Sequence, residues 1–153
     1  MNPRNAYREE TVRGAHPVQL VVLLYEQMIE DLRQAVNAME QNHIALRTNK
    51  INHAIAVIAY LESSLNKEAG GQVAMNLERF YHQLRGYLVL AQSRVSRAIL
   101  SQQIMDLLSL REAWSEVERQ VKSTEAAGAN SRTISPVMNL SVPATRRLAD
   151  WKG

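Results

Sequence analysis

Acidic and histidine side chains are the first candidates for chemistry in this chain, because both residue types bind metal ions. The chain has four histidines and no cysteine, and its one Glu-x-x-His pair joins Glu40 to His43. A di-iron carboxylate site in a helical bundle needs two such pairs and two more glutamates that face the core. A single pair among polar residues near a predicted helix end is not enough, so the sequence predicts no metal site and no cofactor.

The motifs of common enzyme classes are also missing. The sequence contains no Gly-rich phosphate loop and no Gly-x-Ser-x-Gly, and without cysteine it has no thiol nucleophile. The pair Gly70-Gly71 is too short to surround a phosphate and instead predicts that a helix stops and restarts there. No group of titratable residues converges on an apolar face, so the sequence predicts that the protein is not an enzyme.

The charge distribution argues against a nucleic acid partner. The net charge is +3, but residues 1–130 hold 14 basic and 14 acidic side chains, so the excess lies entirely in residues 131–153. A protein that binds phosphates normally carries a basic stripe on its folded surface. We therefore expect no nucleic acid to bind the body of the protein.

The absence of cysteine fits a reducing compartment, and the first residues lack the apolar run of a signal peptide. The longest apolar run, Leu20 to Tyr25, is far shorter than the ~20 residues that cross a bilayer. The sequence therefore predicts a cytoplasmic protein without a membrane span.

Helical periodicity with short connectors predicts an all-α fold, an antiparallel up-down four-helix bundle. The expected helices are residues 17–41, 44–66 (starting at 44 or 48), 71–94 and 98–123. We expect residues 1–123 to form one domain whose residues 1–16 are a flexible arm. Residues 124–153 read as an irregular tail with one short helix near 144–151, which is either disordered or docked on the body or a partner.

Rotation by ~100° per residue predicts one apolar face on each helix. Met28, Leu32, Val36 and Met39 define the core direction of the first helix. The other faces comprise Ile51, Ala54, Ile55, Ile58, Leu61 and Leu65; Val73, Leu77, Phe80, Tyr81, Leu84, Leu88 and Ala91; and Leu100, Leu107, Leu110, Trp114, Val117 and Val121.

Several apolar residues lie outside these faces. Leu23 points nearly opposite to the core direction of its helix, and Leu20 and Val22 lie at the margins. On the other helices the surplus residues are Val57, Tyr60, Leu90, Met105 and Leu108. Single exposed apolar residues are ordinary, but their number predicts a bundle that either self-associates or offers grooves to an amphipathic helix of another protein.

The order and spacing of certain residues are those of a known family. The matching positions near the start are Tyr7, Val12, Ala15, Pro17, Leu20 and the run Leu23-Leu24-Tyr25-Glu26. Further on they are Leu65, Gly70, Gly71, Asn76, Leu77, Tyr81, Leu88 and Ala91, followed by residues 110–114 with Trp114. Over residues 5–121 the chain thus resembles the flagellar secretion chaperone FliS family.

This resemblance implies a cytoplasmic export chaperone that binds the disordered C-terminal segment of flagellin one to one. Binding would prevent premature polymerisation, and the chaperone would escort flagellin to the flagellar type III export apparatus, where export components are further candidate partners. It also implies that the N-terminal arm covers part of the binding surface, with Tyr7 as a movable cap. The predicted flagellin-binding residues are Tyr7, Val12, Leu20, Val22, Leu23, Tyr60, Leu90 and Leu108.

Two other interpretations stay open at this point. A structural homo-oligomeric helical bundle would use the surplus apolar residues for self-association. A nucleic-acid or membrane-surface module would instead act through the basic tail, and its binding would collapse with added salt.

Overall fold

A computed structural model describes residues 17–126 of the chain. The expected arm at residues 1–16, with Tyr7 and Val12, lies outside this range. So do most of the expected tail and its predicted short helix near 144–151.

The described residues form four helices and no strand, which confirms the predicted fold class. The helices are α2 (Pro17–Glu40), α3 (Ile44–Ser63), α4 (Lys67–Arg94) and α5 (Arg97–Ala126). Their ends agree closely with the expected ones, except that α4 begins at Lys67 instead of Gly71 and α5 continues to Ala126.

Local signals in the sequence explain where the helices begin and end. Pro17 opens α2, where its missing N–H costs no hydrogen bond. The side chains of His43 and Asn66 cap α3 and α4 by accepting hydrogen bonds from backbone N–H groups three residues on. Asn42 (φ 56°) and Val95 (φ 52°) adopt the left-handed conformation that terminates a helix.

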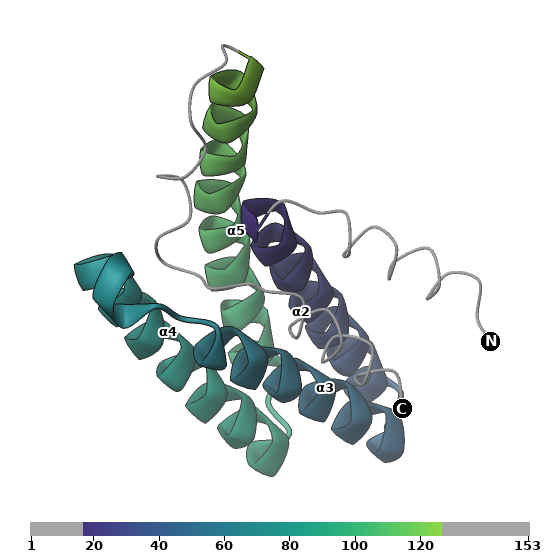
Figure 1. The fold of residues 1–153 in the computed structure, drawn as a ribbon. Coiled ribbons are helices and arrows are strands. Elements are labelled where there is room, and N and C mark those ends of the chain that lie inside the picture. Colours follow the sequence, from purple (N-terminus) through teal and green to yellow (C-terminus); the bar gives the residue numbers. More distant parts are fainter. Residues whose placement is uncertain (1–16, 127–153) are drawn as a thin grey trace, which may run out of the picture.

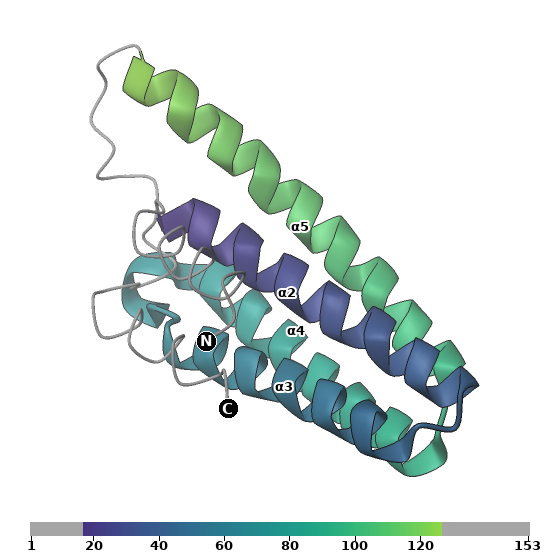
Figure 2. The same cartoon turned by 90° about the vertical axis from the view of Figure 1, so that its right-hand side faces the viewer.

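The helices pack as an antiparallel bundle in which each contacts its neighbours in sequence and α5 closes against α2 (Figures 1 and 2). The contacts of α2 with α3 and with α5 are more extensive than those made by α4. Helix α2 is therefore the most enclosed element of the bundle.

This enclosure explains the almost continuous apolar stretch at the start of α2. Val18, Val21 and Tyr25 are fully buried in the core, and the marginal residues Leu20 and Val22 are buried as well. On α3, Val57 is also fully buried, although it lies outside the predicted face. A helix packed between two neighbours buries a wider arc than one apolar face.

The predicted core face of α4 is wrong at Val73, which is 54% exposed. Figures 1 and 2 show that α4 and α5 diverge from their connection, so that the start of α4 lies far from the end of α5. The exposure of Val73 agrees with this separation, because it lies near the start of α4, where α5 is distant. Leu77, Tyr81, Leu84, Leu88 and Ala91 are buried, as predicted.

A kink interrupts α4 at Gly71, where the sequence predicts a stop and restart. Gly71 has φ 54° and ψ −131° inside an otherwise helical segment. Lys67, which precedes the kink, forms an ion pair with Glu78, which follows it, and this hydrogen bond lowers the pKa of the Glu78 carboxyl. The first turn of α4 is thus set at an angle to the rest of the helix.

Gly71→Ala should destabilise the bundle by about 1–2 kcal/mol, because a side chain with a Cβ rarely adopts this backbone conformation. Gly86→Ala is the matched control, since Gly86 has ordinary helical geometry in the same helix and open space around it. The control should be more stable than the parent protein by about 0.5–1 kcal/mol. Urea unfolding of both variants measures the difference, and a Gly71→Ala variant as stable as the control would contradict the strained geometry.

Candidate functional site

The structure distributes the predicted binding residues over separate parts of the bundle. Leu20 lies on the same side of α2 as Asp31, and Tyr60 on the same side of α3 as His53. Because Asp31 bonds to His53, Leu20 and Tyr60 both belong to the contact between α2 and α3. Each is only 4% exposed.

The remaining described members of the set lie elsewhere. Val22 is 6% exposed and sits one turn before Glu26, which pairs with Arg111 of α5. Leu23 and Leu108 are partly buried and pack against the core, whereas Leu90 is partly buried on α4. The six described residues therefore form no single exposed patch, and Leu23, Leu90 and Leu108 are the accessible ones.

Three aromatic residues that carry the family resemblance meet inside the core. The hydroxyl groups of Tyr25 and Tyr81 lie 2.5 Å apart, and the two rings are tilted with their centroids 6.5 Å apart. Burial raises the pKa of both hydroxyls well above the ordinary value; in Tyr25 the neighbouring Tyr81 adds to this shift and a hydrogen bond with Trp114 opposes it. This cluster joins α2, α4 and α5 and satisfies its polar groups internally.

A second buried polar contact joins α2 to α3. The Asp31 side chain is 1% exposed, and its Oδ2 accepts a hydrogen bond from the His53 ring at 2.5 Å. Gln27 donates to the other carboxylate oxygen at 3.0 Å. This pair was not among the residues predicted from the sequence, where only the apolar neighbours of Asp31 indicate that it is buried.

The exposed apolar surface gathers on α4. The large exposed apolar residues of α4 are Val73, Met75, Tyr87 and Val89, and Val95, which caps the end of the helix, is exposed as well. Ile44 of α3 and Met105 of α5 are the further members of this class among the described residues. Of these residues, Met105 was predicted to lie outside the core and Val73 was predicted to be buried, whereas the others were not predicted. Among the missed residues only Tyr87 has a signal in the sequence, because it follows Val73 and Phe80 at intervals of seven residues.

The Glu-x-x-His pair has structural roles. His43 caps α3, and Glu40 pairs with Arg97 across the bundle end at 3.2 Å. Among residues 17–126 no three His, Asp or Glu side chains lie close enough together to hold a metal ion. None of the helices in this range is long and apolar enough to cross a membrane.

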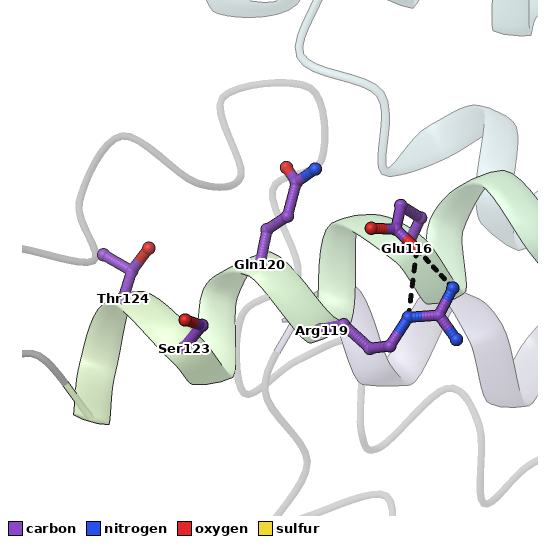
Figure 3. Close-up of a pocket in the computed structure, with 5 residues that line it drawn as sticks. All are labelled: Glu116, Arg119, Gln120, Ser123 and Thr124. Atoms are coloured by element: carbon purple, nitrogen blue, oxygen red, sulfur yellow. Dashed lines mark hydrogen bonds and ion pairs between the residues drawn. The ribbon is translucent and has the colours of Figure 1, made fainter.

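Figure 3 shows a pocket on the last turns of α5. Its lining residues are Glu116, Arg119, Gln120, Ser123 and Thr124. The Arg119 guanidinium bonds to Glu116 on the same helix, and this contact raises the pKa of the arginine. Because one helix supplies every lining residue, the pocket does not bring reactive groups together from different parts of the fold.

Comparison with known proteins identifies the family. The family described as flagellar protein FliS matches residues 1–121. A flagellar secretion chaperone FliSB of Pseudomonas aeruginosa is 34% identical over 69% of this chain and 84% of its own length. The FliS chaperones of Vibrio cholerae and Salmonella typhimurium are 27% and 28% identical over 80% and 77% of this chain, and over 93% and 88% of their own lengths.

The match extends across all four helices up to residue 121 and includes the buried aromatic cluster. The all-helical architecture and the sequence relationship agree. The chain therefore belongs to the FliS family of flagellar secretion chaperones.

Proposed function

We propose that this protein is a cytoplasmic chaperone that binds the C-terminal segment of flagellin one to one. It prevents premature polymerisation of flagellin and escorts it to the flagellar type III export apparatus. The observation that carries the proposal is the family match over residues 1–121, supported by relatives that are named flagellar secretion chaperones. Membership in this family makes the protein a chaperone and not an enzyme.

The physical properties of the bundle support this role. A disordered segment that becomes helical on binding needs an apolar surface on a preformed scaffold, because burial must offset its loss of conformational entropy. The core cluster, with ten further apolar side chains packed against it, provides the scaffold. The large exposed apolar side chains, of which Val89 is 55% and Met105 62% exposed, provide surface.

The proposed contact residues fall into two groups by accessibility. Leu23, Leu90 and Leu108 are partly exposed and can meet flagellin without rearrangement. Leu20, Val22 and Tyr60 are buried, so flagellin reaches them only if it displaces whatever covers them. Tyr7 and Val12 belong to the proposal through the family resemblance, in which the N-terminal arm covers the binding surface.

Co-purification with flagellin tests the proposal. Full-length flagellin should remain bound to the chaperone at one copy each, and flagellin without its C-terminal segment should not. Circular dichroism of the complex should show more helix than the sum of the separate proteins, because the captured segment folds on binding. Retention of the truncated flagellin would overturn the proposed binding mode.

A charge at the partly exposed position of Leu23 tests the binding surface in the same assay. Leu23→Glu should weaken capture of full-length flagellin, because the partner must desolvate the new carboxylate. Asn37→Glu is its control, since it adds the same charge at an exposed position near the other end of α2. Equal capture of flagellin by the two variants would show that Leu23 is not part of the binding surface.

A further inference from the structure

An apolar stripe made of Val73, Phe80 and Tyr87 runs along α4. These residues recur every seven positions, which keeps them within about 40° of one another around the helix. Val73 is 54% and Tyr87 47% exposed, while Phe80 is partly buried and packs against the core. The stripe therefore borders the core and is open to solvent at both ends.

Side-chain contacts show which flank of α4 carries the stripe. Arg85 pairs with Glu62 of α3 at 2.8 Å, and Gln92 donates to Thr48 of α3 at 2.7 Å. Arg85 and Gln92 lie on the opposite side of the core face from Phe80 and Tyr87 by helical rotation. The stripe therefore lies on the flank of α4 that faces away from α3. On this side the other neighbour of α4 is α5, and the two helices diverge from their connection (Figures 1 and 2).

The position where α5 ends favours one occupant for the stripe. Helix α5 ends at Ala126, at the end of the bundle where α4 begins. Residues 127–153 follow, and at ~3.3 Å per residue they span up to about 90 Å when extended. The 30 residues of α5 measure only about 45 Å. Every position on α4 is therefore within reach, and the tether supplies an effective concentration of order mM.

The composition of this segment fits an apolar stripe. In a helix following Pro143, Ala144, Leu148 and Trp151 share one face, whereas Arg146 and Asp150 lie on the other. Tryptophan is a common anchor at interfaces because it buries a large area with few rotatable bonds. The family match ends at residue 121, so this segment lies outside the matched part of the chain.

We propose that residues 144–151 fold back as a short amphipathic helix and dock Leu148 and Trp151 on the stripe of α4. The docked segment occupies the flank that the divergence of α5 leaves open. It competes there with any partner helix that needs Val73 and Tyr87, and it detaches when such a partner binds more tightly than the tethered segment.

Because the chain has no cysteine, introduced cysteine pairs report the contact without interference. The full chain with Arg147→Cys and Gln83→Cys should form an intramolecular disulfide under mild oxidation, since Arg147 borders the apolar face of the docked helix and Gln83 is exposed beside Phe80 and Tyr87. The matched control combines Arg147→Cys with His82→Cys. His82 is also exposed, but by helical rotation it lies on the side of α4 opposite the core. We expect at least a tenfold faster reaction for the Gln83 pair at low protein concentration.

A third variant tests the apolar contact itself. Adding Tyr87→Glu to the Gln83 pair should reduce its rate to that of the His82 control while the melting temperature of the bundle stays unchanged. Equal rates for the Gln83 and His82 pairs would overturn the proposal. Disulfides that form between molecules and increase with protein concentration would also overturn it, because they would identify a second copy of the chain as the occupant.

Discussion

Leu32→Glu should prevent the bundle from folding. Leu32 is fully buried in the middle of α2, the helix that packs against both α3 and α5. A glutamate there places a carboxylate among apolar side chains without a partner, at a cost of several kcal/mol. Since a domain of this size has a total stability of about 5–15 kcal/mol, circular dichroism should show loss of helix and of the cooperative thermal transition.

Val89→Glu is the control for this experiment, because it makes a comparable apolar-to-acidic change at a position that is 55% exposed on α4. Its helix content and melting temperature should stay within a few degrees of the parent protein. If Leu32→Glu melts like Val89→Glu, the middle of α2 is not the centre of the core.

The helices themselves were predictable because each is specified locally. Pro17 marks the start of α2, and the apolar periodicity predicts most buried residues, whereas the cap at Asn66 was not recognised and α4 was predicted to begin at Gly71. The errors at Val57 and Val73 have another cause. Periodicity gives the direction in which a helix faces the core, but the number and spacing of its neighbours decide how wide an arc is buried.

The binding surface was less predictable than the fold. The resemblance includes Tyr25, Tyr81 and Trp114, which are buried and hold three helices together. Such residues identify the family through its core, so they do not mark where a partner binds. The exposure of Val73 and Tyr87 depends on the divergence of α4 from α5, a tertiary feature that no local pattern encodes.

His53→Leu should destabilise the bundle by ~3–5 kcal/mol, a large effect for a side chain that is 25% exposed. The cost arises at its partner, because the Asp31 carboxylate would remain 1% exposed and lose the ring that bonds to Oδ2. Gln27 would still donate a hydrogen bond to Oδ1 of Asp31, but Oδ2 would lose the hydrogen bond from the His53 ring. Urea unfolding at neutral pH measures the loss.

The double variant Asp31→Leu with His53→Leu separates this explanation from a simple loss of packing. Removing both members leaves no buried carboxylate to satisfy, so the double variant should recover most of the stability that His53→Leu loses. Arg97→Leu is the control for an exposed pair between helices, since Arg97 and Glu40 are 60% and 49% exposed, and it should cost less than ~1 kcal/mol. If the double variant is less stable than His53→Leu alone, the imidazole stabilises the fold through its own contacts, and the buried carboxylate is not the source of the cost.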